Sequence, residues 1–594
     1  MGAKTLNGHE IYFAFLAGTK KVSEYKDYLN SINVFPVYDS DTGNNLSETL
    51  NYIVNEVRPT SSADETMRMI ADASLNGARG NSGIIIAQFI NGLSQEIEGN
   101  KQLPADILAQ SLVKSVPYAY NAISKPVEGT ILTVIKDWSE AFEKACSQTS
   151  DLTNLFSESL KSARISLEGT TDKLAVLKEA NIVDAGAQGF IHFLEGIADL
   201  IKTNNIRELI RTKIKPVTVY NHQEHHEEDL TWRYCCEGLL TGEDIDHQRI
   251  KNELEGLGSS VIVAGNKMKV KFHLHSNEPE NLFLALRKYG LVSQQKVDDM
   301  KNQYDLVNHR RHRIALVTDS IADLPETFIE ENQIQMIPIN INIEGSNFLD
   351  KKTIYPKQLF SMIDELSEYP TSSQPSVNAV KHTLEFLKNK FDSVIMISVS
   401  KELSGTWNVF RTCAEDLSKQ GYTVSVVNSR LNSGAQGLMV KKAAELIEQG
   451  KDHDEIVSIL EDTVSRTNIY VSVSDFQYMV RGGRVSPLKG AAAKILNLKP
   501  IISLDEEGKG TAFASALSQR GNLKKIVSIA EEVKKKGSLD RYAVVHAAAP
   551  ERAETYRKIF TEMFGQEPEF VQEISSVVAL SAGLGAVALC IMEA

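Results

Sequence analysis

The chain has 594 residues, 42% of them hydrophobic and 24% charged, and a formal net charge of −13. This length exceeds what one hydrophobic core organises, so we expect about three or four domains in a protein of ordinary globular composition. The acidic balance argues against nucleic acid as a general partner, because binding a phosphate backbone requires a basic face.

An acidic pair followed by small polar residues is the first informative feature. Asp39 and Asp41 stand in the stretch DSDTGNN and lead into an expected turn of Thr42, Gly43, Asn44 and Asn45. Carboxylates are hard ligands for Mg²⁺, and the bare amides of such a turn suit phosphate oxygens. The pattern favours a site for metal-bound phosphate and hence kinase chemistry. The alternative is a loop of Asp, Gly and Asn that merely turns the chain.

Two further small-residue turns precede apolar segments. GARGNSG at 77–83 precedes the apolar run 84–90, and VDAGAQG at 183–189 precedes Phe190. Each predicts a turn that leads into a helix, whose N-terminus offers free amides and the positive end of its dipole to anions. Either turn alone is weak evidence. In this order, the three segments together resemble the nucleotide-binding domain of dihydroxyacetone kinases, and more closely its version in bacterial fatty acid kinases.

This resemblance covers roughly the first third of the chain, and we place the domain at residues 1–208. It implies an all-helical barrel that binds ATP, with two magnesium ions held by Asp39 and Asp41. The residues implied around the phosphates and the nucleotide are Thr42, Gly43, Asn44, Asn45, Asn81, Ser82, Asp184 and Gly186. The usual fatty acid kinase form, PDGDTGTNM, has glycine where this chain has Ser40. A side chain there would restrict the turn and lower nucleotide affinity.

A different pattern, of strand, helix, strand, strand and helix, follows a polar linker. The expected strands are 234–240, 261–264 and 267–276, and the expected helices are 244–257 and 279–289. Short strands that alternate with helices on this scale are typical of a small α+β domain, which we place at residues 228–305.

Histidines and cysteines on two of these strands form a candidate metal site. In VKFHLH the period of two places Lys271, His273 and His275 on one face. Cys235 and Cys236 face opposite sides of their strand, so at most one of them joins the histidines. A solvated histidine pair is the alternative.

The stretch YCCE followed by KFHLHSNEP resembles the middle domain of fatty acid kinases, whose usual form is YCTE followed by KVHVHT. The resemblance implies a zinc ion held by Cys235, His273 and His275, residue types that suit zinc, and a dimerisation surface. Whether such a zinc is structural or catalytic stays open.

From Ile314 onward, short β-branched strands alternate with helices. This predicts an α/β fold with a mainly parallel sheet, in which ligands lie beyond the carboxyl ends of strands. Polar residues follow the first expected strand at Asp319 and Ser320 and the third at 400–406. The expected strands are 314–318, 336–343, 394–398, 424–427, 469–473 and 542–545.

Four motifs in this part, VTDSIADLP, YPTSSQPS, SKELSGTWN and YMVRGGRVS, resemble the DegV-type fatty-acid-binding proteins. The resemblance spans residues 312–594 and implies a two-lobed α/β domain that buries one long-chain fatty acid in an apolar tunnel. It implies that Ser372 and Ser404 bind the carboxylate. Arg481 and Arg484 flank the RGGR turn and are implied in docking to the kinase or in headgroup binding; a solvated surface turn is the alternative. Ser581 stands where the family usually has histidine, so headgroup affinity is expected to differ.

The segment from Ser575 to Met592 contains no charged residue and is borderline in length for a membrane span. Its Gly, Ala and Ser content favours a buried glycine turn with a flanking strand or helix. The N-terminal residues lack an apolar core of signal-peptide length, and the five cysteines are scattered. We therefore expect a cytoplasmic protein with reduced thiols and at most transient membrane contact.

Together these resemblances predict a fatty acid kinase fused to its own acyl carrier domain. It would transfer the γ-phosphate of ATP to the carboxylate of a bound fatty acid, giving acyl phosphate for phospholipid synthesis. The expected partners are a second copy of the chain and a downstream acyltransferase. The alternatives are an ATP-gated lipid sensor without turnover and a small-molecule kinase of the dihydroxyacetone type.

Overall fold

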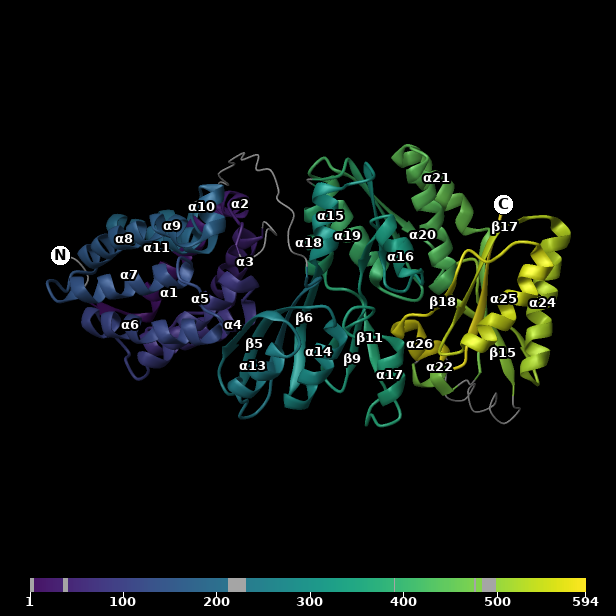
Figure 1. Cartoon of the computed structure of the whole chain (residues 1–594), viewed down its shortest axis with the longest axis horizontal. Helices are drawn as coiled ribbons and strands as arrows, with labels where there is room; N and C mark the ends of the chain where they lie inside the picture. Colours follow the sequence, from purple (N-terminus) through teal and green to yellow (C-terminus); the bar gives the residue numbers. More distant parts are fainter. Residues whose placement is uncertain (1–4, 36–40, 212–230, 389, 475–476, 483–497) are drawn as a thin grey trace. The chain divides into compact units, whose positions relative to one another are not determined.

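A computed structural model describes the chain except for residues 1–4, 36–40, 212–230, 389, 475–476 and 483–497 (Figure 1). The chain divides into two compact units, Met1–Gln303 and Tyr304–Ala594. The kinase-like and middle regions expected from the sequence thus fall within one unit. The expected boundaries at 208 and 228 remain predictions.

The first part of unit 1 is helical, as predicted, apart from a short ribbon in which β1 (Thr5–Leu6) pairs antiparallel with β2 (Leu103–Pro104). Its helices are α1 (Gly8–Glu24), α2 (Lys26–Ser31), α3 (Thr42–Glu56), α4 (Ala63–Gly77), α5 (Gly80–Glu96), α6 (Ala105–Ala122), α7 (Ile131–Cys146), α8 (Leu152–Glu168), α9 (Thr170–Lys173), α10 (Ala175–Ala180), α11 (Ala185–Thr203) and α12 (Ile206–Arg211).

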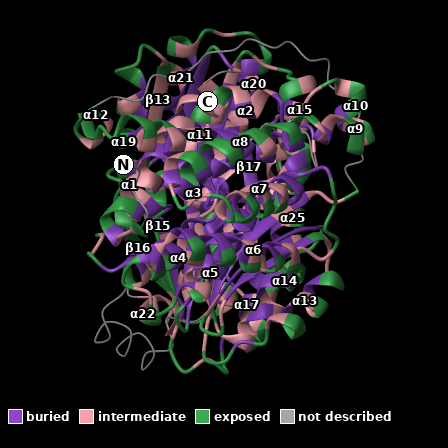
Figure 2. Cartoon of the chain, turned by 90° about the vertical axis from the view of Figure 1, so that its left-hand side faces the viewer, coloured by how far each residue is buried: buried purple, intermediate pink, exposed green. Residues whose placement is uncertain are grey.

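Helix α5 is central to the core of these helices. Every residue from 83 to 93 is buried, whereas the peripheral α12 has no buried residue (Figure 2). A helix that is apolar on all sides belongs in an interior. Phe89 of α5 meets Phe190 of α11 edge to face, and Trp138 of α7 packs on the same ring. The aromatic contacts therefore join α5, α7 and α11.

The second part of unit 1 is a four-stranded antiparallel sheet in the order β4-β5-β3-β6. Its elements are β3 (Tyr234–Thr241), α13 (His247–Glu255), β4 (Ser259–Gly265), β5 (Lys269–Ser276), α14 (Pro279–Leu286), a 3₁₀ turn (Arg287–Tyr289) and β6 (Leu291–Asp299). The predicted order is confirmed. However, α13 starts after Asp246, whose side chain caps it, and β6 was not predicted because LVSQQKVDD lacks a clear apolar alternation.

Both faces of this sheet are buried. Phe272 packs against Phe283 of α14 on one side. On the other side the sheet contacts the helical part, where the Gly265 N–H donates to Gln88 Oε1 (2.8 Å) and Asn91 donates to the Gly265 carbonyl (3.2 Å). Antiparallel sheets commonly leave one face in water, but here the helices of unit 1 cover it.

Unit 2 begins with a lobe built on the parallel sheet β13-β12-β7-β8. Helix α15 (Met300–Asn308) precedes the first of these strands in the chain. The expected strand 336–343 is wrong: it is divided into two strands of different sheets at Pro338, which has no N–H to continue a ladder. The elements are β7 (Ile314–Asp319), α16 (Glu326–Glu331), β8 (Gln335–Ile337), β9 (Asn340–Ile343), β10 (Ser346–Leu349), α17 (Pro356–Met362), β11 (Thr371–Ser373), α18 (Val377–Lys388), β12 (Ser393–Ser398), α19 (Thr406–Ser418), β13 (Thr423–Asn428), α20 (Ser433–Glu448) and α21 (His453–Val464).

The second lobe of unit 2 corrects the prediction of a mainly parallel sheet. Its six strands run in the order β16-β15-β14-β19-β17-β18, and of these pairings only β17–β18 is parallel. β15 and β16 form a hairpin, which requires antiparallel strands. The elements are β14 (Thr467–Ser472), α22 (Gln477–Arg481), β15 (Lys499–Leu504), β16 (Gly510–Ala516), α24 (Gln519–Lys536), β17 (Leu539–His546), α25 (Pro550–Phe564), β18 (Val571–Glu573), α26 (Ser576–Ala582) and β19 (Val587–Glu593).

The uncharged segment near the C-terminus forms α26, a turn and β19. Gly583 and Gly585 shape the turn with φ of +76° and +80°, a conformation that glycine adopts without strain. β19 lies inside the sheet between β14 and β17. The predicted glycine turn with flanking helix and strand is confirmed. Among the described residues, no helix is long and apolar enough to cross a membrane.

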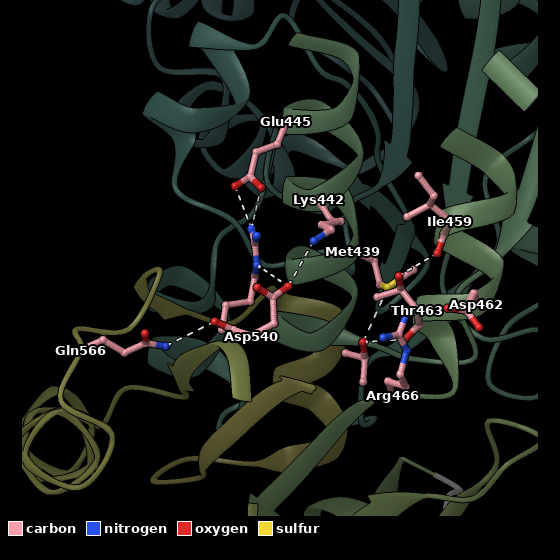
Figure 3. Close-up of polar contacts among 11 residues, drawn as sticks. Met439, Lys442, Glu445, Ile459, Asp462, Thr463, Arg466, Asp540 and Gln566 are labelled. Atoms are coloured by element: carbon pink, nitrogen blue, oxygen red, sulfur yellow. Dashed lines mark hydrogen bonds and ion pairs between the residues drawn. The ribbon is translucent and has the colours of Figure 1, made fainter. Parts of the chain in front are cut away.

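Ion pairs tie α20 to β17 (Figure 3). Arg541 donates to both carboxylate oxygens of Glu445 (2.7 and 2.8 Å), and Lys442 pairs with Asp540 (3.2 Å). Only 12% of the Arg541 side chain is exposed, so water screens this bidentate pair less than a surface pair.

We expect Arg541→Ala to lower the free energy of unfolding by about 2 kcal/mol, because it leaves Glu445 without its bidentate partner. The matched control is Arg466→Ala, which removes an exposed pair with Asp462 worth about 0.5 kcal/mol or less. Thermal unfolding of the full chain would compare the two. Equal decreases in the free energy of unfolding for the two variants would contradict a special role for Arg541.

Candidate active site

The predicted phosphate-binding residues lie in the first turns of helices rather than in loops. Thr42 begins α3, Gly80 begins α5 and Ala185 begins α11. The expectation that residues 42–45 form a turn is therefore wrong, because Asp41 already occupies the N-cap position of α3. The backbone amides of these residues are still suited to phosphate, since the first amides of a helix have no partner within the helix and attract anions.

These helix starts lie together. A Cβ built on Gly80, whose φ is +58°, would lie 2.2 Å from Asn45 Nδ2. A Cβ on Gly186 would lie 2.7 Å from Ser82 Oγ. The structure thus gathers the predicted residues of α3, α5 and α11 at one place. Their roles toward a nucleotide remain predictions.

The acidic pair is described only in part, because Asp39 lies outside the described residues. Asp41 accepts from the Asn45 N–H through its backbone carbonyl (2.8 Å), and its side chain makes no capping hydrogen bond to α3 within the described structure. Asp41 is half-buried. Binding of a metal ion by Asp41 remains a prediction.

Two predicted phosphate-binding residues also hold α3 in place. The Thr42 hydroxyl donates to Asn33 Oδ1 (2.8 Å), and the Asn44 N–H donates to Asn30 Oδ1 (3.1 Å). Both partners lie at or just beyond the end of α2. Thr42 and Asn44 thus position the helix start, and any contact with phosphate would be an additional role.

Close packing of α3 against α2 explains why a glycine stands at position 43. A Cβ there would lie 2.0 Å from the Lys26 carbonyl oxygen and 2.8 Å from Asn30 Oδ1. We expect Gly43→Ala to lower the free energy of unfolding by about 1–3 kcal/mol and to weaken nucleotide binding, because α3 must move away from α2. Thermal unfolding and nucleotide titration would measure both. Gly510→Ala is the control, since a Cβ at that glycine meets no described atom within 4 Å.

Asp184 caps two helices at once. Its Oδ1 accepts from the Ala187 N–H (2.7 Å) of α11 and from the Ile131 N–H (3.1 Å) of α7. Burial raises the pKa of this carboxyl to about 6, although the two N–H donors oppose the shift. Asp184 therefore fixes the start of α11, where Gly186 lies. That Asp184 lies near a bound nucleotide remains a prediction.

The candidate metal ligands converge on one face of the middle sheet. Cys235 on β3 stands opposite His275 on β5, and the ligand atoms of Cys235, His273 and His275 all lie within 4.8 Å of one another. Cys235 Sγ is 3.8 Å from His273 Nδ1. Cys236 points to the opposite face and is fully buried there. The predicted faces of these two strands agree with this arrangement.

The chemistry of these residues fits zinc. His273 Nε2 is buried and has no hydrogen-bond partner among the described residues. Burial, and next the neighbouring His273, lower the pKa of His275 to about 3, so its imidazole is in the neutral form that binds metals. One thiol and two imidazoles are typical zinc ligands and leave a fourth position open. Zinc itself remains a proposal.

Glu237 links this cluster to the start of α5. Its Oε1 accepts from the Gly80 N–H (2.6 Å) and lies 3.4 Å from His273 Nδ1. Burial opposes ionisation, but the contact with His273 and the charges of Lys296 and Lys271 hold the pKa of Glu237 well below its usual range. The carboxylate is thus ionised and shared between the cluster and the helix.

Lys296 is a second link between the candidate sites. It lies on β6 opposite Glu237, forms an ion pair with Asp298 (2.7 Å) and lies within electrostatic range of Asp41. Sequence reasoning missed both Glu237 and Lys296 as site residues. The glutamate of YCCE was part of the quoted motif and could have been found, whereas β6 carried no recognisable pattern.

In unit 2 the structure brings two DegV-like motifs together. Ser404 precedes α19, and its Oγ lies 2.8 Å from Thr406 Oγ1. A Cβ on Gly405 would lie 1.7 Å from Gln374 Oε1, two residues after Ser372 on the exposed strand β11. The segments that carry Ser372 and Ser404 are therefore neighbours. Their joint binding of a carboxylate remains a prediction.

Arg481 ends α22 and stacks on an aromatic ring. Its guanidinium carbon lies 5.8 Å from the centre of the Tyr369 ring, and the Tyr369 hydroxyl donates to the Leu580 carbonyl (2.7 Å). A Cβ on Gly482 would lie 3.5 Å from Ser581 Oγ. The RGGR turn thus starts beside Ser581. Arg484 lies outside the described residues, and headgroup binding by Arg481 remains a prediction.

Asp319 and Ser320 stabilise the interior of the first lobe. Asp319 Oδ2 accepts from the Val399 N–H (2.8 Å) and Oδ1 from Gln436 (3.1 Å), while the Ser320 hydroxyl donates to Asp350 (2.6 Å). Both residues are fully buried. Their position after the first strand therefore serves to connect loops within the lobe.

Three family models match consecutive parts of the chain. They are the DAK2 domain at 36–199, the fatty acid kinase-like middle domain at 231–307, and the DegV family at 313–594. The chain is a fusion of these three parts. The DAK2 part corresponds to the helices of unit 1, the middle domain to its four-stranded sheet, and the DegV part to the two lobes of unit 2. The fold classes predicted for the three regions are confirmed.

Curated relatives include uncharacterized proteins of Staphylococcus aureus. Those of strains bovine RF122 / ET3-1 and MRSA252 are each 31% identical over 318 residues, which is 52% of this chain and 58% of the relative. The fusion chain thus spans little more than half the length of these relatives. Among solved structures, DegV, a fatty acid binding protein from Bacillus subtilis, is 27% identical, with 48% of this chain and 100% of that chain covered and a TM-score of 0.43. A fatty-acid-binding DegV family protein from Thermus thermophilus is 26% identical, with the same coverage and TM-score.

Proposed function

We propose that this fusion protein is a fatty acid kinase that carries its own acyl-binding domain. ATP would phosphorylate the carboxylate of a long-chain fatty acid held by the DegV part, giving ADP and an acyl phosphate for phospholipid synthesis. The observation that carries the proposal is the fatty acid kinase-type middle domain between a DAK2 domain and a DegV part in one chain. The contact of its Glu237 with the start of α5 supports a joint site.

The proposed reaction requires no proton transfer. A carboxylate oxygen attacks the γ-phosphorus, the bond to the β,γ-bridging oxygen breaks, and the electron pair leaves with ADP. A fatty acid carboxylate is already ionised near neutral pH, so no strong general base is needed. The protein's task is to position the groups and to neutralise charge on the transferred phosphoryl group.

The chain offers groups suited to that task. Asp39 and Asp41 would hold magnesium, and amides in the first turns of α3 and α5 other than those of Asn44 and Gly80 would donate to phosphate oxygens. Cys235, His273 and His275 would hold a zinc ion, which would supply a Lewis acid or a structural crosslink beside the site. The remaining carboxylate there, Glu237, would orient His273 through its Nδ1.

Fusion gives the proposed carrier a physical advantage. A tether replaces a bimolecular encounter with an effective concentration on the order of millimolar for a short flexible linker. A buried headgroup would also protect the labile mixed anhydride from water. Transfer within one chain and transfer across a homodimer both fit this scheme. An acyltransferase in the cytoplasm would consume the product.

Hydroxylamine trapping tests the proposal. The purified chain is incubated with magnesium, ATP and labelled long-chain fatty acid, and acyl hydroxamate is quantified after hydroxylamine is added. We expect hydroxamate to form with ATP and not with ADP. Retained lipid without hydroxamate would favour an ATP-gated sensor. ATP consumption with dihydroxyacetone in the absence of lipid would favour a small-molecule kinase.

A further inference from the structure

Three cationic side chains meet where the middle sheet contacts the start of α5. Arg79 is the N-cap residue of α5, Lys271 lies on β5 and Lys296 lies on β6. Lys271 lies within electrostatic range of both other cations and of Glu237. Like charges gathered in a buried place repel one another, so an anion bound among them would lower the electrostatic free energy of the site.

Glu237 is a described anion near Lys271, but no hydrogen bond or ion pair joins the two within the described residues. Lys296 pairs with Asp298 (2.7 Å), Arg79 lies 4.0 Å from Glu48, and Glu237 Oε1 is bonded to Gly80. The Lys271 side chain is fully buried, yet its Nζ has no hydrogen-bond partner within the described parts of the chain. A buried ammonium group without a hydrogen bond costs several kcal/mol, and native proteins rarely keep one without a function.

Polar atoms at the start of α5 are also buried without a partner. In the described structure, Arg79 Nη1 and Asn81 Oδ1 are buried without a hydrogen-bond partner. Both belong to the start of α5, whose amides favour anions. Lys296 in turn lies within electrostatic range of Asp41, the described member of the predicted magnesium pair. The unpartnered donors of Arg79 and Lys271 thus adjoin the place where the nucleotide phosphates are proposed to lie, whereas Asn81 Oδ1 is an acceptor.

We propose that Arg79, Lys271 and Lys296 form an anion subsite that binds the oxygens of the transferred phosphoryl group. The inference rests on the proposed function and adds that the middle domain supplies two of the three cations. Phosphoryl transfer spreads charge over three equatorial oxygens, and fixed cations in a water-poor site stabilise that charge. The DAK2 part would bind ADP by itself, whereas recognition of the transferred group would require the middle sheet.

The test compares ligands that differ only in the transferred group. Isothermal titration of the full chain would measure Kd for magnesium ADP and for magnesium ADP with aluminium fluoride, which mimics the phosphoryl group. We expect Lys271→Met and Lys296→Met each to weaken binding of the fluoride complex by about tenfold or more and binding of ADP by less than about threefold. Lys267→Met is the control, since this lysine of the same domain is 80% exposed and pairs with Asp244.

Lys296→Met decides the question if Lys271→Met does not fold, because the Lys296 side chain is 23% exposed and tolerates an apolar replacement better. Equal losses of affinity for ADP and for the fluoride complex, or no loss of affinity for either, would contradict the proposed subsite. Lysine-dependent binding of the fluoride complex without acyl hydroxamate in the trapping assay would support the subsite and reject the fatty acid as acceptor. Normal hydroxamate formation with unchanged fluoride binding in both variants would reject the subsite alone.

Discussion

Replacing Asp41 by asparagine is expected to lower acyl phosphate formation by about a thousandfold or more. The amide is neutral and binds Mg²⁺ weakly, so the charge of the metal-bound phosphates is no longer neutralised during transfer. The fold should persist, because the bond from Asp41 to Asn45 uses the backbone carbonyl. Bound fatty acid should persist as well, since the proposed carboxylate ligands Ser372 and Ser404 belong to unit 2.

The measurement is the yield of acyl hydroxamate per minute, with lipid content determined on the same sample. Asp172→Asn serves as the control, because that carboxylate belongs to the same helical region and its side chain is 80% exposed. A rate unchanged by Asp41→Asn would remove the carboxylate pair from the proposed mechanism. Loss of lipid together with activity would point to a general folding defect instead.

Replacing Cys235 by serine is expected to abolish tight zinc binding. The thiolate is the anionic ligand of the three, and a serine hydroxyl does not ionise at neutral pH to replace it. We expect about one zinc ion per chain in the wild-type protein and less than about one tenth of that in the variant. Metal analysis after gel filtration, with and without a chelator, measures this directly.

The neighbouring cysteine provides the control for this experiment. Cys236 is fully buried on the opposite face of β3, so Cys236→Ala should keep its zinc. Wild-type zinc content should also fall on acidification, because protons compete with the metal for the thiolate and imidazoles. A wild-type protein free of zinc after purification in zinc-containing buffer would contradict the proposed metal site.

Local patterns predicted much of the fold. The alternation in VKFHLH correctly placed His273 and His275 on one face, since strand periodicity is contained in a few residues. The small-residue segments at 77–83 and 183–189 correctly indicated that helices follow, although α5 and α11 already begin inside them, at Gly80 and Ala185. Predictions failed where a single residue or a distant partner decides the outcome. Pro338 divided an expected strand, and hairpin pairing made the second sheet of unit 2 largely antiparallel.

The sequence by itself determined the order of the three parts, the spacing of the predicted carboxylate pair and the ligand types of the candidate metal site. Only the tertiary structure decided that these features adjoin. Gly80 and Glu237 are 157 positions apart, and their hydrogen bond depends on how the sheet packs against α5. The same packing buries Lys271, which the strand pattern places on the histidine face without indicating what covers that face. Periodicity records which side of an element a residue occupies, whereas proximity between distant elements follows from the packing of the whole unit.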